Sequence, residues 1–241
     1  MTENELIQSA RVRFAAASRI AVLTGAGISA DSGVPTFRGV DGLWRNFRAE
    51  DLATPEAFER DPRLVWEWYN WRREILATKK PNAAHHALVR LEERTQQFHL
   101  ITQNVDGLHR LAGSQKLSEL HGNIWKVRCT SCRLVIDNRD VPLSLLPHCH
   151  TCGGLLRPHI VWFGEALDDQ VLAKCFRAVE SCDVMVIVGT SGLVYPAAML
   201  MPAGQANGAF VIEINLDPTP YTSDVALSLQ GRAKDILPLL L

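Results

Sequence analysis

The fold is decided by the stretch Gly25-Ala26-Gly27-Ile28-Ser29-Ala30-Asp31-Ser32-Gly33-Val34-Pro35-Thr36-Phe37-Arg38-Gly39, which follows the apolar run Ile20–Leu23. It begins like a dinucleotide-binding fingerprint, in which closely spaced glycines permit a sharp turn and let the backbone approach a pyrophosphate. In a dehydrogenase a long helix would follow and hold that phosphate at its N-terminus. Here Gly33, Pro35 and Gly39 end any helix within about two turns. The sequence therefore predicts a loop, in place of a long helix, next to a bound dinucleotide.

The size and composition of the chain are those of an ordinary globular protein. Its 241 residues suit one large domain, or one domain with a small insert, and 47 % of them are hydrophobic. The net charge of −1 gives no electrostatic reason to bind nucleic acid or anionic lipid. The sequence shows no signal-peptide pattern and no apolar run of the roughly 20 residues that a membrane span needs. We expect a cytoplasmic monomer with no nucleic-acid and no membrane partner.

Strands and helices alternate along most of the chain. We expect helices over residues 3–17, 62–76, 82–93, 168–181 and 196–205, and strands over 20–23, 98–102, 183–188 and 209–215. This alternation predicts a parallel sheet with helices on both faces, whose ligands bind beyond the carboxyl ends of the strands. Each predicted strand runs into a polar or glycine-rich loop: GAGIS, TQNVD, GTS and INLD.

Four cysteines interrupt that rhythm between about residues 123 and 156. Cys129-x-x-Cys132 is followed, after sixteen residues, by Cys149-x-x-Cys152, the spacing of a four-thiolate zinc site. Four thiolates leave no open coordination position, so the ion is expected to be structural. Two disulfides are the alternative, and His148 or His150 could replace a cysteine ligand. Cys175 and Cys182 lie outside the module and are expected to pack as small hydrophobic residues.

At this point the chain resembles the sirtuins, a family of NAD-dependent protein-lysine deacylases. The matching motifs, in the family's order, are the glycine loop 25–39, Thr102–His109, His121-Gly122, the four cysteines, Val161–Glu165, Gly189–Ser191 and Asn215–Asp217. The resemblance implies an α/β fold with a Rossmann-like NAD domain at residues 1–122 and 157–241, carrying a helical insertion at about 40–80. A small zinc domain would occupy residues 123–156, and substrate would enter between the two. NAD would be consumed: the acyl-lysine oxygen attacks the ribose, nicotinamide leaves, and 2′-O-acyl-ADP-ribose is released.

The resemblance also implies a role for individual residues. His121 matches the family's general base, and imidazole titrates near neutrality, as removal of a proton from a ribose hydroxyl requires. Asn104 and Asp106 match residues of the nicotinamide and ribose pocket and complete the catalytic set. The residues expected to bind the cofactor are Gly25, Ala26, Gly27, Ser29, Phe37, Arg38, Gln103, Asn104, Val105, Asp106, Gly189, Thr190, Ser191, Asn215, Asp217 and Ala233. The segment Val161, Trp162, Phe163, Gly164 and Glu165 is expected to take the substrate peptide as an added strand.

Two residues of the predicted helix at 62–76 indicate which acyl group the protein removes. Tyr69 and Arg72 are three apart and share a helix face, where a phenol and a guanidinium together can bind a carboxylate. The pair matches the Y-x-x-R of the class III sirtuins, which remove succinyl, malonyl and glutaryl groups, and Ala49 matches a small residue that leaves room for the longer chain. For an arbitrary sequence, a solvated Arg paired with a nearby Glu would be the commoner explanation.

Several alternatives stay open on the sequence alone. A classical dehydrogenase lacks support, because the long helix and the acidic residue about 20 positions after it are missing. An inactive NAD-binding sensor is disfavoured because His121, Asn104 and Asp106 are all present. The enzyme could be mainly a deacetylase, or could transfer ADP-ribose to a protein.

Overall fold

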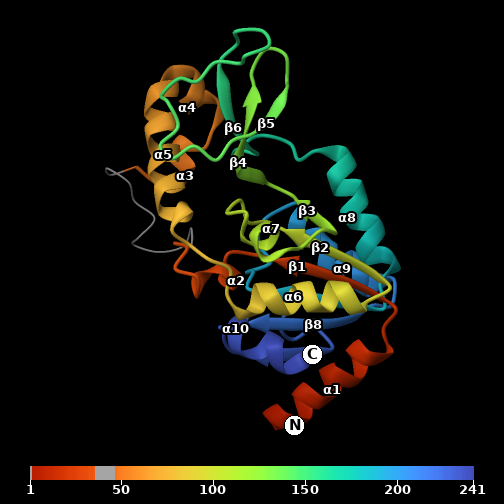
Figure 1. The fold of residues 1–241 in the computed structure, drawn as a ribbon. Helices are drawn as coiled ribbons and strands as arrows, with labels where there is room; N and C mark the ends of the chain where they lie inside the picture. Colours follow the sequence, from red (N-terminus) through yellow and green to blue (C-terminus); the bar gives the residue numbers. More distant parts are fainter. Residues whose placement is uncertain (1, 36–46) are drawn as a thin grey trace.

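The core of the molecule is a six-stranded, fully parallel sheet, shown in Figure 1 for the computed structural model, which describes residues 2–35 and 47–241. Its strands lie in the order β3-β2-β1-β7-β8-β9. Their bounds are β1 Arg19–Thr24, β2 Gln97–Thr102, β3 Leu117–Glu119, β7 Val184–Val188, β8 Phe210–Asn215 and β9 Leu227–Gln230. The chain builds outward from β1 in one direction, then returns to its other side at β7. This order confirms the predicted α/β, Rossmann-like class, and its reversal point between β1 and β7 is where such sheets bind ligands.

Helices cover both faces of this sheet (Figure 1). On one face pack α1 (Glu3–Ala16), α6 (Ala83–Arg94), α10 (Ala233–Ile236) and the 3-10 turn η3 (Leu237–Leu240); on the other pack α8 (Asp169–Ser181), η2 (Ala197–Met199) and α9 (Leu200–Ala206). Successive strand residues therefore enter different cores: Ile20 and Val22 join the first, Ala21 and Leu23 the second. Burial on both sides explains why these strands are continuous apolar runs.

Local signals set the ends of these helices. Asn82 accepts a hydrogen bond from the Ala84 N–H at 2.9 Å and caps α6, and Asp168 caps α8 in the same way. The glycine loop contains only α2 (Gly27–Ala30), a four-residue helix. The prediction that no long helix follows the fingerprint is confirmed.

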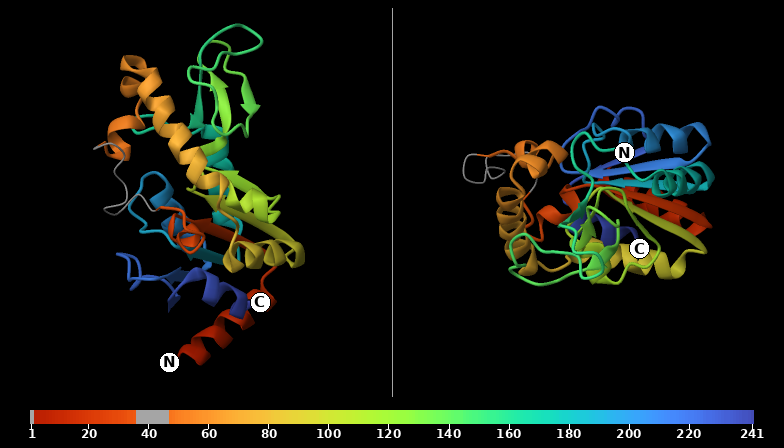
Figure 2. Two further views of the ribbon diagram at one scale, coloured as in Figure 1. Left: turned by 60° about the vertical axis from the view of Figure 1, so that its left-hand side comes forward. Right: turned by 90° about the horizontal axis from the view of Figure 1, so that it is seen from above.

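A second lobe contains a three-stranded antiparallel sheet in the order β5-β4-β6. Its strands are β4 Gly122–Cys129, β5 Val135–Asp137 and β6 Leu156–Ile160, and the helices α3 (Ala49–Leu52), α4 (Pro55–Arg60) and α5 (Pro62–Ala77) share a core with them. Figure 2 shows α5 alongside this sheet, well away from most of the parallel one. The helical insertion, which the sequence analysis grouped with the NAD domain, thus packs with the cysteine module.

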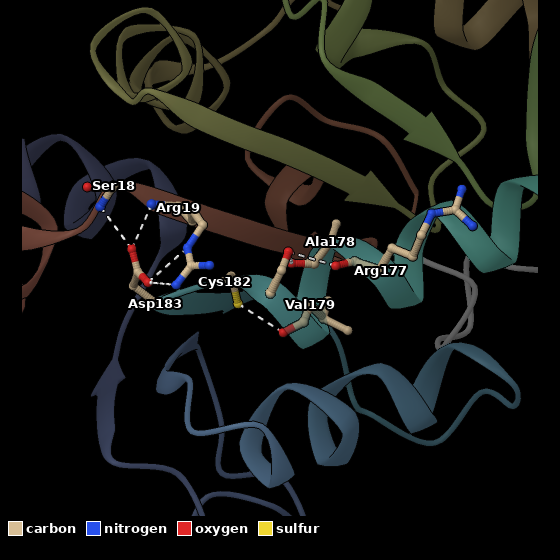
Figure 3. Close-up of polar contacts among 8 residues, drawn as sticks. Ser18, Arg19, Arg177, Ala178, Val179, Cys182 and Asp183 are labelled. Carbon is tan, nitrogen blue, oxygen red and sulfur yellow. Dashed lines mark hydrogen bonds and ion pairs between the residues drawn. The ribbon is translucent and has the colours of Figure 1, made fainter.

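The amino ends of β1 and β7 are joined by one carboxylate (Figure 3). Asp183 accepts hydrogen bonds from the backbone N–H of Ser18 and Arg19, and its other oxygen binds the Arg19 guanidinium at 2.6 Å. A cavity of about 330 Å³ lies beside it, lined among others by Arg19, His99 and Cys182. It sits at the end of the sheet opposite the glycine loop, and its arginine is already paired, so we assign it no function.

Among the described residues, the structure contains no helix with the length and apolar character needed to cross a bilayer.

Candidate active site

The loops after β1 and β7 meet backbone to backbone. The Gly27 N–H donates to the Gly189 carbonyl at 2.8 Å, and a Cβ on Gly27 would lie 2.7 Å from the Gly189 Cα. A Cβ on Gly25 would lie 2.7 Å from that of Thr190, and Gly189 has a φ of +59°. Side chains are excluded here by contact distance, which accounts for the glycines at the reversal point of the sheet; Gly25 is buried, and Gly27 and Gly189 are half-buried. This junction suits the predicted NAD site.

Hydrogen bonds tie the neighbouring loops to this junction. Gln103, after β2, donates to the Thr190 hydroxyl at 2.9 Å, and Asn215, at the end of β8, donates to the Thr190 carbonyl at 3.0 Å. Four strand ends thereby form one continuous rim. The predicted cofactor residues on it are Gly25, Ala26, Gly27, Ser29, Gln103, Asn104, Val105, Asp106, Gly189, Thr190, Ser191 and Asn215.

Other predicted cofactor residues lie at the edges of this rim. Asp217 follows β8 and is exposed, and Ala233 is the first residue of α10, which packs against α2. Arg232 and Lys234, on either side of Ala233, form ion pairs with Asp31 at 3.2 and 3.5 Å, so α10 is held to the end of the glycine loop. Phe37 and Arg38 lie outside the described residues.

A cluster of polar side chains contacts the start of the glycine loop. The Asn104 amide donates to the Gly25 carbonyl at 3.0 Å and to the Ser29 hydroxyl at 3.3 Å, and His85 Nε2 lies 3.4 Å from the same hydroxyl. The ring of His85 lies 4.8 Å from that of His109, and burial lowers the pKa of both, that of His85 to about 4. Both histidines are therefore neutral at physiological pH.

Sequence reasoning did not identify His85 or His109 as members of this site. His109 Nε2 lies 3.0 Å from the Thr24 hydroxyl at the end of β1. The only local signal was the Asn82-x-x-His85 capping pattern, since Asn82 N–H and His85 Nδ1 are 3.3 Å apart. That pattern predicts a helix start and says nothing about Ser29.

His121 sits between β3 and β4 with its ring oriented by the backbone. Its Nδ1 lies 2.9 Å from the Gln103 carbonyl, which can only accept, so Nδ1 carries the hydrogen. In the neutral ring the lone pair then lies on Nε2, and burial, its largest influence, lowers the pKa of His121. The ring is thus a neutral base with one fixed basic nitrogen.

Asp106, which is buried, and Arg72, which is half-buried, form the charged part of the site. The Asp106 carboxylate accepts the Leu108 N–H at 2.8 Å and is 5 % exposed. Burial is the largest influence and raises its pKa, while Leu108, Ser29 and Arg72 act in the opposite direction. Burial likewise lowers the pKa of Arg72, which Tyr69 and Asp106 partly counteract. The Arg72 side chain is half-buried, and its guanidinium carbon lies 5.1 Å from the centroid of the Trp68 ring.

Helix α5 presents different residues to the cysteine module and to this site. Trp66 donates to the Leu156 carbonyl at 3.0 Å, and Asn70 donates to the Leu143 carbonyl at 2.7 Å. Arg73 donates to the carbonyls of Ile124, Asn138 and Asp140. These three follow helical spacing along one face, whereas Tyr69 and Arg72 lie on another. The predicted acyl-binding pair is therefore carried on a helix whose other face is anchored.

The predicted peptide segment 161–165 runs beside His121. The Val161 N–H donates to the His121 carbonyl at 3.0 Å, and the Phe163 N–H donates to the Ala53 carbonyl at 2.9 Å. The Trp162 N–H and the Glu165 N–H also have acceptors within the segment. An added strand would therefore bond to the remaining groups, the Gly164 N–H among them. Ala49, the small residue expected beside the acyl chain, begins α3 and packs against the core of the same lobe.

The four predicted zinc ligands converge. All four sulfur atoms lie within 4.8 Å of one another, with Cys132 and Cys149 3.8 Å apart and Cys129 and Cys152 3.4 Å apart. Zinc–sulfur bonds of about 2.3 Å place tetrahedral sulfurs about 3.8 Å apart, so the set fits one ion. Gly154 is required beside it, because a Cβ there would lie 2.9 Å from the Cys129 sulfur.

Comparison with known proteins identifies the class to which this fold and site belong. The Sir2 family profile matches residues 25–196. The NAD-dependent protein deacylase of Aquifex aeolicus is 53 % identical over 89 % of this chain and 90 % of its own. The mitochondrial NAD-dependent protein deacylase sirtuin-5 of Danio rerio is 46 % identical over 95 % of this chain and 84 % of its own. A crystal structure of a Sir2 homolog–NAD complex superimposes with a TM-score of 0.91 at 46 % identity, covering 97 % of this chain and 92 % of the other.

The chain belongs to the Sir2 family, the sirtuins, which are NAD-dependent protein deacylases. NAD is the co-substrate of this class, and the cysteine cluster is its four-cysteine zinc site.

Proposed function

We propose that this sirtuin removes succinyl and malonyl groups, and acetyl groups less efficiently, from lysine side chains of proteins. The products are the free lysine, nicotinamide and 2′-O-acyl-ADP-ribose. The observation that carries the acyl preference is the pair of Tyr69, a buried neutral phenol, and Arg72, a half-buried cation, on one face of α5. A carboxylate at the end of an acyl chain would accept hydrogen bonds from both the phenol and the guanidinium, whereas the methyl group of an acetyl chain accepts none.

The NAD molecule supplies a ribose whose bond to nicotinamide can be broken. In our proposal the rim of the parallel sheet holds it, with the glycine junction near the phosphates and Asn104, Asp106 and Ser29 near the nicotinamide ribose. The short contacts among Asn104, Gly25 and Ser29 support this assignment, because they fix the loop before a ligand arrives.

His121 is proposed as the general base. Its Nε2 accepts the proton of a ribose hydroxyl, and the hydrogen bond from Nδ1 to Gln103 holds the ring while the charge develops. The segment 161–165 is bonded to His121 through Val161, so a peptide lying along it would be directed toward the base. Because such pairing uses backbone groups, we expect weak preference for the peptide sequence.

The proposal is tested with one peptide carrying acetyl-, malonyl-, succinyl- or glutaryl-lysine, incubated with NAD and followed by mass spectrometry. We expect kcat/KM to be highest for the succinyl or malonyl form, with acyl-ADP-ribose as the second product. Arg72→Met should lower desuccinylation about ten- to hundredfold, the effect of losing a charged hydrogen-bond partner, and deacetylation far less. Equal losses would sink the carboxylate assignment. A wild-type preference for acetyl-lysine would indicate a deacetylase, and labelled ADP-ribose on protein would indicate a transferase.

A further inference from the structure

The phenol of Tyr69 has a partner from the other side of the lobe. The indole N–H of Trp162 donates to the Tyr69 hydroxyl oxygen at 2.8 Å, across 93 residues of sequence. Tyr69 is 1 % and Trp162 2 % exposed. Water therefore does not compete for this hydrogen bond. The bond orients the Tyr69 hydroxyl group in the folded protein.

The direction of this bond fixes what Tyr69 can offer a ligand. An indole N–H and a guanidinium can only donate, so neither Trp162 nor Arg72 can take the hydroxyl hydrogen. Burial raises the pKa of Tyr69 to about 12, so that hydrogen is present at every physiological pH. The phenol is left as a hydrogen-bond donor beside a cation. Such a pair matches the oxygens of a carboxylate and gives nothing to the methyl group of an acetyl chain.

The Trp162 indole is itself held in place by Arg157 and Phe58. The Arg157 guanidinium carbon lies 3.3 Å from the centroid of the Trp162 ring, and the Phe58 ring lies 5.2 Å away. Arg157 binds both oxygens of Glu165, at 2.6 and 2.8 Å, and one of these oxygens also accepts the Trp162 backbone N–H at 2.8 Å. Stacking and the carboxylate bridge thus fix both the ring and the backbone of Trp162.

We propose that Trp162 is a positioning residue for acyl specificity: by donating to Tyr69 it keeps the phenol turned as a donor toward the end of the acyl chain. This inference rests on the proposed deacylase function and assigns part of its specificity to a residue that need not touch the acyl group. Trp162 was expected, from sequence, only as part of the strand that binds peptide.

The test is Trp162→Phe, which removes the N–H and keeps an aromatic ring. Steady-state kcat/KM is measured for succinyl- and acetyl-lysine forms of one peptide at saturating NAD. We expect the succinyl-to-acetyl ratio to fall about fivefold, the size of a single buried hydrogen bond, with the change mainly in KM of the succinyl peptide. A fall of both activities by the same factor would overturn the proposal.

A matched control is Trp66→Phe, which also removes a buried indole hydrogen bond in the same lobe, to Leu156. We expect it to change the ratio less than twofold; a fivefold change would mean that general loosening of the lobe sets the ratio. If Trp162→Phe does not fold, Glu165→Gln, which weakens the bridge to Arg157, should lower the same ratio, and an unchanged ratio would count against us.

A double-mutant cycle separates this inference from the proposed function. If Trp162 acts through Tyr69, the double variant Trp162→Phe/Tyr69→Phe should have the same succinyl-to-acetyl ratio as the single Tyr69→Phe variant. If the two residues act independently, the fold-changes that the two substitutions cause in this ratio should multiply. Arg72→Met tests the carboxylate site itself. If Arg72→Met keeps the wild-type succinyl-to-acetyl ratio, the proposed acyl preference is wrong. If Arg72→Met lowers this ratio and Trp162→Phe leaves it unchanged, only the present inference is wrong.

Discussion

At the scale of single residues, one backbone carbonyl orients His121, the proposed general base. The bond from Nδ1 to Gln103 selects the tautomer, and burial lowers the pKa from 6.5. The base must be neutral to accept a proton, so kcat/KM should rise with pH through a pKa below 6.5 and be constant above it. His121→Ala should lower kcat by about 10² to 10⁴. A pH profile of wild type, with exposed His86→Ala as the control variant, checks both; an acid limb above pH 6.5 would contradict the assignment.

Two neutral histidines, the buried His85 and the half-buried His99, also make folding sensitive to acid. Burial lowers the pKa of His85 and of His99 to about 4, whereas the unfolded chain protonates near 6.5. Between these values the unfolded state binds more protons, so stability is complete above pH 6.5 and falls as the pH drops toward 4. His99→Gln should make the denaturant midpoint fall less steeply over this window. A slope for His99→Gln parallel to that of the wild type would refute the argument.

The residues that were predictable from sequence are those whose signal is local. Asn82 and Asp168 cap helices from one position, and the cysteine pairs have a fixed spacing. The bonds from Trp162 to Tyr69 and from His85 to Ser29 join residues 93 and 56 positions apart, and no spacing rule reaches that far. His121 was predicted through its family motif, while its orientation required the position of Gln103.

At the scale of secondary-structure elements, the junction of the β1 and β7 loops tolerates no side chain. In Gly27→Ala the new Cβ would lie 2.7 Å from backbone atoms of Gly189, which cannot move as a flexible side chain could. We expect loss of stability together with a KM for NAD raised about tenfold, because the backbone that we propose to face the phosphates must shift. Gly208→Ala, whose Cβ meets nothing within 4 Å, is the control and should lose stability without affecting the KM for NAD. An unchanged KM in Gly27→Ala would exclude this junction from NAD binding.

Two adjacent arginines of α5 should give opposite phenotypes. Arg73 is 1 % exposed and donates to three backbone carbonyls of the cysteine module, so Arg73→Met leaves these unsatisfied and should cost about 2–4 kcal/mol of stability. Its succinyl-to-acetyl ratio should match wild type. Arg72→Met should show the reverse, a small change in stability and a large change in ratio. Chemical denaturation and peptide kinetics on both variants test the division of the helix into two faces.

The helical period alone predicted that Tyr69 and Arg72 share a face of α5, but the period could not say which face is anchored. That depended on Leu143, Leu156 and Asn138, which come from irregular stretches and short strands of the module. The helices α3 and α4 and the strand β9 were not predicted, because each is short and lacks a periodic signal.

At the scale of the whole molecule, the two lobes have separate cores. Among the described residues, the two cores of the parallel sheet contain no residue between 123 and 160, whereas the third joins the cysteine module to α3, α4 and α5. The α/β alternation predicted the first lobe, and the cysteine spacing predicted the module. That the insertion and the module share one core could not be predicted, since it depends on Trp66 and Phe58 meeting strands far along the chain.

This arrangement predicts the outcome of removing zinc. The cysteine module shares its core with α3, α4 and α5, so without the ion its cysteine knuckles lose their geometry and this shared core loosens. Tyr69 and Arg72 are residues of α5, whereas the contact between the glycine loops after β1 and β7 belongs to the parallel sheet. Chelation should therefore lower deacylation more than tenfold, while ADP-ribose binding, measured by calorimetry, weakens far less.

Re-adding zinc should restore activity. In the chelated protein, the second lobe should unfold at a lower temperature than the parallel sheet. Cys132→Ala should behave like the chelated protein and respond only weakly to added zinc, because three thiolates leave the fourth coordination position to water. If chelation abolished ADP-ribose binding and deacylation together, in one transition, the lobes would be a single cooperative unit. The separate cores would then describe packing alone, and α5 would owe its position to the parallel sheet as much as to the zinc module.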